Sequence, residues 1–182
     1  MTVKQYLHLY LNEKSNIPHW CHLIPREVAE RAGPWNESLT LNDDGEYAAR
    51  IIAASGGLAH AGSGPLYFYR KTPGSLSTVN SPDKVRSGIS ALDKIAVLAS
   101  RNGVDMTQTK LFLKYYSLMT ACYPSSKPYL MDLEDRINRF GGGKFSAILG
   151  GRAINFIAKI AGWKFARRLQ LAKQKIFRLN AK

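Results

Sequence analysis

The densest group of acidic side chains in the sequence is the segment Asn42-Asp43-Asp44-Gly45-Glu46. Carboxylates this close together repel one another, so a cation, a helix N-terminus or a proton-transfer task has to offset the repulsion. Acidic residues are common in the first turn of a helix, where Asn42 or Asp43 would act as the cap. The pattern therefore leaves two interpretations open, an ordinary helix start and a general base that takes a proton from a hydroxyl group.

Two short helices are expected to position these side chains. Residues 25–32 and 43–54 are predicted to be helical, because apolar side chains recur at helical spacing and Gly-Pro or Gly-Gly pairs follow them. Residues 58–61 and 66–70 are predicted to be short strands, because both are apolar runs beside the Gly- and Pro-containing turn 62–65. This region therefore combines loops, short strands and short helices.

The middle of the chain is expected to be wholly helical. Ser81 followed by Pro82 predicts a helix start, with a hydroxyl cap and a proline in the first turn. An apolar stripe then runs to Gly103, and similar patterns predict further helices over 106–122 and 129–140.

Most of the excess positive charge lies at the C-terminal end. Residues 144–182 contain ten Lys and Arg and no Asp or Glu, whereas the whole chain has a net charge of +13. Apolar side chains recur there at three- and four-residue steps, which predicts one basic amphipathic helix. We expect it to lie on an anionic membrane surface, with Phe156, Ile160 and Trp163 at the headgroup boundary. The alternative is that the apolar stripe packs on the preceding helices.

Other sequence features bear on the partners and the compartment. Residues 144–182 would also suit nucleic acid, but we regard that partner as unlikely because no zinc-finger, RNA-recognition-motif or helix-turn-helix pattern is recognisable. No apolar run approaches the roughly 18 residues that cross a bilayer, and the first residues do not resemble a signal peptide. Cys21 and Cys122 favour a reducing compartment, with a disulfide as the alternative. We therefore expect a cytoplasmic protein, peripheral on the inner face of the membrane.

Several residues between 25 and 77 form an ordered series. In chain order they are Arg26, Gly33, Trp35, Glu37, Asp43-Asp44, Arg50, Gly56-Gly57, Tyr69-Arg70 and Gly74-Ser75-Leu76-Ser77. Their order and spacing resemble the second, acceptor-side half of the family-two glycosyltransferases of the GT-A fold. The resemblance implies an α/β fold, here a partial nucleotide-diphospho-sugar transferase domain over 1–80 that is locally mostly helical with a few short strands. A helical extension over 81–140 and a basic amphipathic tail over 141–182 would follow.

The resemblance also implies an activity. Enzymes of this family move a sugar from a nucleotide-sugar donor to a hydroxyl of a sugar or lipid-linked acceptor, with inversion at the anomeric carbon. Asp44 matches the catalytic base, and Asp43 stands beside it where many relatives have Glu. Glu46 and Arg50 are expected to support the acidic loop, Arg50 through an ion pair, with a solvated surface Arg as the alternative.

Two binding groups follow from the same resemblance. The acceptor group combines an aromatic ring with imidazoles and comprises His19, Trp20 and His22. The donor group offers cationic and hydroxyl donors to the diphosphate and comprises Arg70, Ser75 and Ser77. Ordinary packing of the first group and a surface turn around the second remain the alternatives.

The sequence departs from the family on the donor side. A complete family domain holds a divalent cation, Mg or Mn, with an Asp-x-Asp motif that this chain lacks, so we assign no metal ligands. We expect this polypeptide alone to transfer little or no sugar, which a nucleotide-sugar turnover assay would test. The competing function is that of a non-catalytic basic helical protein that binds a membrane surface or nucleic acid.

Overall fold

The computed structural model describes residues 1–12, 21–60, 62, 81–125, 128–142 and 149–180. These residues form helices joined by loops, and none of them lies in a strand, so the expected α/β fold is wrong for the described part of the chain. Among the described residues, 58–60 have no neighbouring strand to pair with. Instead, Leu58 exchanges backbone hydrogen bonds with Met1, its N–H donating to the Met1 carbonyl at 2.9 Å. The second predicted strand, 66–70, lies outside the described residues.

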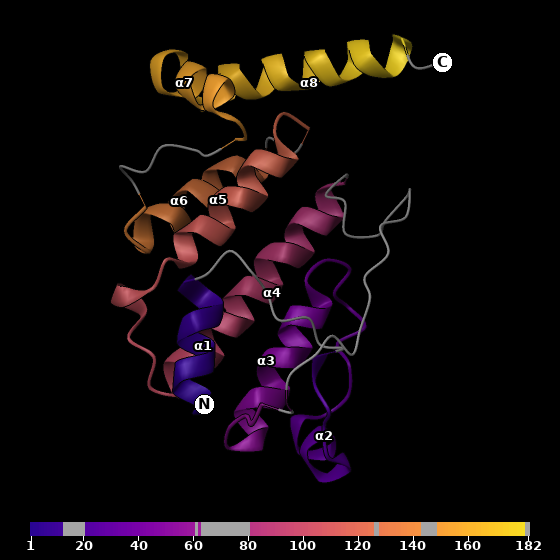
Figure 1. Ribbon diagram of the computed structural model, residues 1–182, viewed down its shortest axis with the longest axis vertical. Helices are drawn as coiled ribbons and strands as arrows, with labels where there is room; N and C mark the ends of the chain where they lie inside the picture. The colour runs from indigo at the N-terminus through magenta and orange to yellow at the C-terminus, as the bar shows by residue number, and fades with distance from the viewer. Residues whose placement is uncertain (13–20, 61, 63–80, 126–127, 143–148, 181–182) are drawn as a thin grey trace.

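The helices are arranged as Figure 1 shows. In order, the described elements are α1 (Val3–Asn12), α2 (Arg26–Ala32), α3 (Asp43–Ser55), α4 (Pro82–Arg101), the short 3-10 helix η2 (Met106–Gln108), α5 (Leu111–Cys122), α6 (Pro128–Arg139), α7 (Arg152–Ala161) and α8 (Trp163–Asn180). The helices predicted over 25–32, 43–54, 106–122 and 129–140 correspond to α2, α3, η2 with α5, and α6.

Helix α4 is central to the packing, because it contacts α1, α3, α5 and α6. Its start is the predicted one, since Ser81 Oγ accepts a hydrogen bond from the Lys84 N–H at 3.3 Å and Pro82 follows. Its apolar stripe is buried against side chains of the neighbouring helices. The largest fully buried side chains are Leu7, Leu11, Val85, Ile95, Leu111, Tyr115, Met119 and Leu133.

Helix α1 is an element that the sequence pattern did not indicate. It buries Tyr6, Leu7, Tyr10 and Leu11 against α3, α4 and α5. Tyr6 and Tyr10, and Leu7 and Leu11, lie four positions apart, as on one face of a helix. The exposed Leu9 between them makes apolar residues recur at every second position, which resembles a strand pattern. Because only long-range packing distinguishes the buried residues from Leu9, the short sequence pattern was ambiguous.

The basic C-terminal segment forms two helices rather than the single predicted one. Gly162 separates α7 from α8 and has a φ of 83°, a left-handed conformation that glycine adopts without strain. The two helices contact each other and lie across one end of the molecule, beyond α5 and α6 (Figure 1). Over the described residues, no helix has both the length and the apolar character that a membrane span requires.

Candidate functional site

The acidic segment forms the first turn of α3. Asn42 precedes it in the left-handed conformation, with a φ of 59°, and its side chain does not cap the helix. Instead, Asn42 Oδ1 accepts a hydrogen bond from the Tyr10 hydroxyl of α1 at 3.3 Å. Asp44 is half-buried, and its Oδ1 accepts a hydrogen bond from the Gly45 N–H at 2.8 Å. The helix start is therefore real, but a contact with another helix replaces the expected side-chain cap.

Tyr10 brings a phenol group next to these acids. Burial raises the pKa of Tyr10 to about 12, and the negative charge of Asp44 contributes in the same direction, whereas the hydrogen bond to Asn42 opposes it. Tyr10 is therefore protonated at neutral pH and donates to Asn42. The fit is tight, since a Cβ atom on Gly45 would lie 2.4 Å from Asn42 Oδ1 and 2.6 Å from the Tyr10 oxygen. Only glycine fits here without a shift of the Asn42 or Tyr10 side chain.

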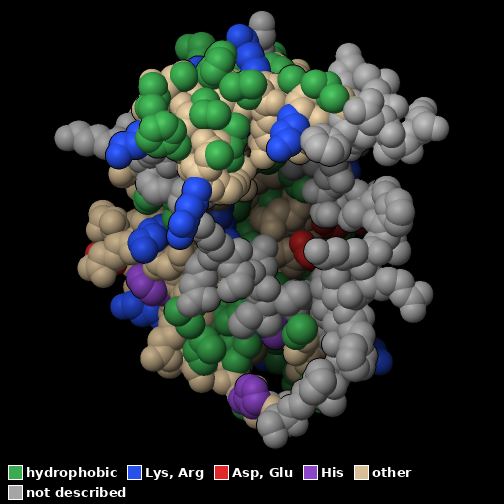
Figure 2. All heavy atoms as spheres, turned by 45° about the horizontal axis from the view of Figure 1, so that its top comes forward, with side chains coloured by type: hydrophobic (Ala, Val, Ile, Leu, Met, Phe, Trp, Pro, Cys, Tyr) green, Lys and Arg blue, Asp and Glu red, His purple; other side chains and the backbone are tan. Residues whose placement is uncertain are grey.

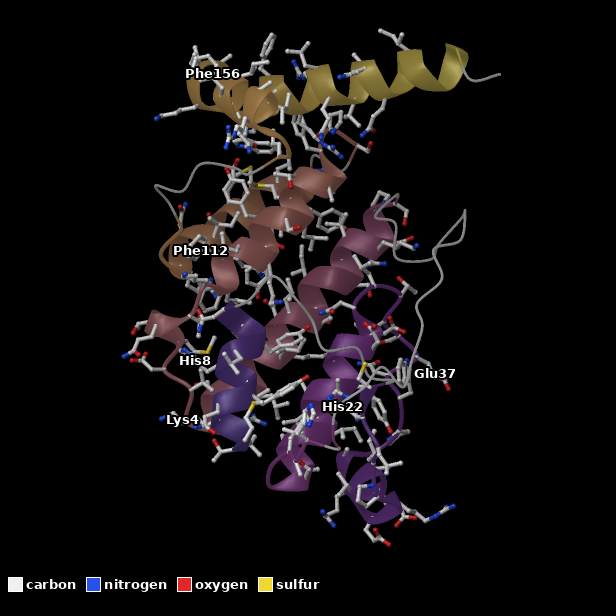
Figure 3. All side chains as sticks on the ribbon, viewed as in Figure 1. Lys4, His8, His22, Glu37, Phe112 and Phe156 are labelled. Atoms are coloured by element: carbon white, nitrogen blue, oxygen red, sulfur yellow. The ribbon has the colours of Figure 1, made fainter. Side chains whose placement is uncertain are left out.

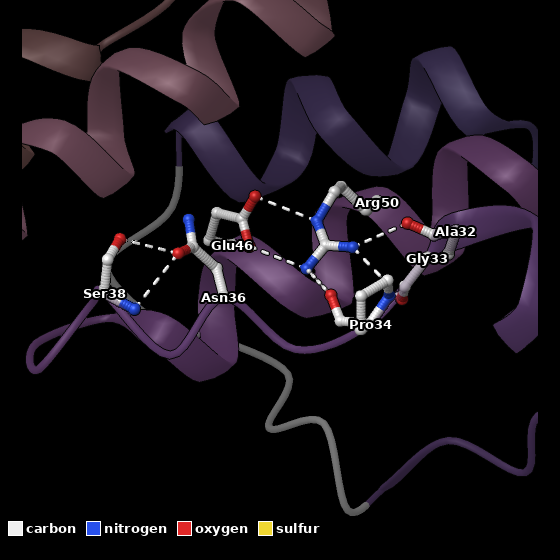
Figure 4. Close-up of polar contacts among 7 residues, drawn as sticks. All are labelled: Ala32, Gly33, Pro34, Asn36, Ser38, Glu46 and Arg50. Atoms are coloured by element: carbon white, nitrogen blue, oxygen red, sulfur yellow. Dashed lines mark hydrogen bonds and ion pairs between the residues drawn. The ribbon is translucent and has the colours of Figure 1, made fainter.

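Arg50, one turn farther along α3, is held by a buried acid and by backbone carbonyls (Figure 4). Its Nε and Nη2 donate to the two carboxylate oxygens of Glu46 at 2.9 and 3.1 Å, and Glu46 is only 5% exposed. The same guanidinium donates to the carbonyl oxygens of Ala32, Gly33 and Pro34 at 2.6, 3.3 and 2.9 Å. A bidentate pair of this kind fixes direction as well as distance. Arg50 thus joins α3 to the loop that follows α2.

Aromatic side chains cover the outer side of this ion pair. The Arg50 guanidinium carbon lies 5.2 Å from the ring centroid of Tyr47, and the rings of Tyr47 and Trp35 lie 4.7 Å apart. Close by, Asn36 Oδ1 accepts hydrogen bonds from the N–H and hydroxyl of Ser38, which forms a compact turn (Figure 4). The loop between α2 and α3 is therefore ordered by side chains from both of its ends.

A serine on α4 holds the residues just before the acids. Ser87 Oγ accepts hydrogen bonds from the Thr40 and Leu41 N–H groups at 2.7 and 3.0 Å. Sequence reasoning missed this residue, because Ser87 lies among Lys84, Arg86 and Ser90 and its neighbours in the sequence do not mark it as buried. With Tyr10, Arg50 and Ser87, three helices contribute to the position of Asp44.

The expected binding groups are only partly described. His22 lies on the α2–α3 side of the molecule (Figure 3), with its ring edge-on to Tyr6 at a centroid distance of 6.1 Å. The other acceptor residues, His19 and Trp20, lie outside the described residues, as do the donor residues Arg70, Ser75 and Ser77. Asp43, Asp44, Glu46 and Arg50 are the predicted site residues that the structure brings together.

The acidic turn does not form a metal site in the described residues. No group of three or more His, Cys, Asp or Glu side chains lies close enough there to hold a metal ion. Glu46 is also engaged by Arg50 through both carboxylate oxygens. The described side chains therefore do not fit the Mg or Mn ion of a complete family domain, and no chemical step is assigned to one.

Comparisons of the chain with protein-family models, curated proteins and solved structures find no match. The family expected from the series of residues between 25 and 77 therefore stays a prediction.

Proposed function

We propose that this chain forms the acceptor side of an inverting sugar-transfer enzyme, in which the Asp44 carboxylate takes the proton of the acceptor hydroxyl. The observation that carries the proposal is the position of Asp44 in the first turn of α3, half-buried and oriented by the Gly45 N–H. The surrounding series of residues, from Arg26 to Gly57, has the order found in enzymes of that class.

The chemistry requires one carboxylate in a defined direction. The acceptor oxygen attacks the anomeric carbon, and the bond from that carbon to the nucleoside diphosphate breaks with its electron pair leaving on the diphosphate. The acceptor hydroxyl proton passes to Asp44 as the new bond forms. Proton transfer of this kind needs a donor–acceptor distance of about 2.6–3.2 Å, so a base on a loosely held loop would be ineffective.

The contacts around α3 supply the required rigidity. Ser87 holds the two backbone N–H groups at positions 40 and 41, and Arg50 holds the loop after α2 against the same helix. Neither residue is proposed to touch the sugar. Their role is positioning, because a displacement of about 1 Å at a reacting group can cost on the order of a hundredfold in rate.

The donor is assigned to the group Arg70, Ser75 and Ser77, whose cationic and hydroxyl donors would stabilise the charge developing on the departing diphosphate. The acceptor is assigned to the side of α3 near His22. Both assignments rest on sequence similarity, and the residues of the donor group lie outside the described part of the chain.

Acceptor binding can be tested directly on the chain. Amide chemical shifts of the isotopically labelled protein would be recorded while simple hexose and N-acetylhexosamine glycosides are added. We expect at least one glycoside to shift the amides of residues 42–47, and we expect Asp44→Ala to abolish that shift. Asp83→Ala is the matched control, because Asp83 also lies in a first helical turn but is exposed and pairs only with Arg86 in the described contacts. If none of the glycosides shifts these amides, the acceptor-side proposal is wrong.

A further inference from the structure

Helices α7 and α8 expose an apolar face that points away from the rest of the molecule. On α7, Phe156 and Ile160 are 64% and 72% exposed, one turn apart. On α8, Phe165, Leu169 and Ile176 are also exposed and share one side of the helix, at spacings of four and seven residues. We call these five residues the outer face. Figure 2 shows hydrophobic side chains gathered over this end of the molecule, with Lys and Arg among them.

The opposite side of α8 packs on the body and is the more polar one. Ala166 is fully buried there, Arg167 donates to Gln170 at 2.6 Å, and Gln170 donates to the Leu149 carbonyl at 3.1 Å. A helix whose partner is only its own domain turns its apolar side inward. Among the described side chains of α8, Phe165, Leu169 and Ile176 face outward, so packing within the described part of the chain leaves them uncovered.

The prediction that Trp163 lies at the headgroup boundary is wrong, because Trp163 packs against the body of the protein. Its ring meets Tyr116 edge-on at 6.1 Å and Tyr123 at 5.2 Å, so it attaches α8 to α5 and to the residue that follows it. Lys164 strengthens the attachment through an ion pair with Glu134 of α6 at 3.3 Å. These contacts fix the outer face in the outward orientation.

The charge of the two helices indicates the partner. Residues 152–180 contain eight Lys and Arg and no Asp or Glu. Those exposed beside the outer face include Arg152 and Lys159 on α7 and Lys173 on α8, whereas the Arg168 guanidinium carbon lies 5.7 Å from the ring centroid of Tyr123. Apolar side chains bordered by cations match the boundary between the acyl chains and the anionic headgroups of a phospholipid bilayer.

We propose that the outer face docks α7 and α8 flat onto an anionic bilayer, with the five apolar side chains at the acyl boundary and the flanking cations on lipid phosphates. A second copy of the chain is a poorer occupant, because two such faces would oppose cations with no acidic residue in either segment. Nucleic acid is also poorer, because the apolar side chains are the ones that project. The outer face lies far from Asp44 in the sequence, so membrane docking and sugar transfer can each be wrong independently of the other.

Vesicle cosedimentation of the full chain tests the docking. We expect binding to phosphatidylcholine vesicles that contain phosphatidylglycerol, weak binding to pure phosphatidylcholine, and a loss of binding as salt is raised. Phe156→Ser with Phe165→Ser should lower the partition coefficient by about tenfold for each substitution. Leu23→Ser with Met131→Ser is the matched control, since both residues are exposed but lie off the outer face. It should leave binding unchanged.

The cationic contribution is measured separately. Arg152→Gln with Lys159→Gln should weaken binding to the anionic vesicles by about fivefold for each charge removed. Circular dichroism checks that each variant keeps its helices, and sedimentation velocity reports its oligomeric state. The proposal is overturned if the chain does not bind anionic vesicles at low salt, or if the two phenylalanine substitutions leave binding intact. It is also overturned if the wild type is a dimer that these substitutions dissociate, because the face would then belong to a second copy.

Discussion

Removal of the Arg50 side chain should destabilise the protein far more than removal of an exposed arginine in an equally short ion pair. In the described contacts, Arg50→Ala leaves the buried Glu46 carboxylate without its cation and three loop carbonyls without their donor. Removal of one partner from a buried pair typically costs about 3–5 kcal/mol. Because the Arg50 side chain is 22% exposed, we expect the lower end, about 3 kcal/mol in the free energy of unfolding.

The chain contains a matched control for this prediction. Arg86 pairs with Asp83 at 2.8 Å, close to the 2.9 Å of the Arg50–Glu46 pair, but these side chains are 69% and 77% exposed. Solvent screens such a pair, so Arg86→Ala should cost less than about 1 kcal/mol. Urea denaturation followed by helical circular dichroism gives both values. In the double variant Arg50→Ala with Glu46→Gln, part of the loss should be recovered, because the unpaired charge is then gone. Equal costs for the two arginines would refute the argument from burial.

Two further predictions concern the contact of α1 with α3 and α5. Gly45→Ala should lower the free energy of unfolding by about 1–3 kcal/mol through overpacking against Asn42 and Tyr10, although alanine normally stabilises a helix. Gly151→Ala is the control, because a Cβ on Gly151 would meet no atom within 4 Å. Gly151 precedes α7, so this substitution should change stability only by the small effect of altering a helix N-cap. A Gly45→Ala substitution that stabilises the protein would contradict the packing argument. Burial lowers the pKa of Lys114 to about 8 from 10.5, so between those values the unfolded chain binds more protons and stability should rise with pH. NMR titration of isotopically methylated lysines should show one lysine with a pKa near 8. Values near 10.5 for every lysine would contradict this prediction.

Local signals in the sequence were sufficient for most helices. The cap at Ser81, the spacing of apolar residues along α4 and α5, and the glycines after α2 and α3 are each properties of a few consecutive residues. The fold class was wrong because it came from the resemblance and not from such signals. A strand needs a partner, and in the described residues Leu58 exchanges hydrogen bonds with Met1 instead.

The candidate site was only partly predictable for the same reason. Glu46 and Arg50 are four residues apart on one helix, so their pairing follows from helical spacing. Tyr10 and Ser87 approach the acidic turn from helices that are distant in sequence, and no pattern in their neighbouring residues predicts these contacts. The outward orientation of the apolar side of α8 was likewise not predictable, because both sides of the helix carry apolar residues. The contacts of Trp163 and Gln170 with residues distant in the sequence show which side is covered.

The proposed sugar transfer depends most on Asp44 as the group that receives the acceptor proton. The direct measurement is the rate of sugar transfer by a polypeptide that contains this segment, at saturating donor and acceptor, for Asp44→Asn and for the neighbouring Asp43→Asn. The account predicts a loss of about 10²–10⁴-fold for Asp44→Asn, with helical content unchanged, and a much smaller loss for Asp43→Asn. Equal losses, or a larger loss for Asp43→Asn, would contradict it.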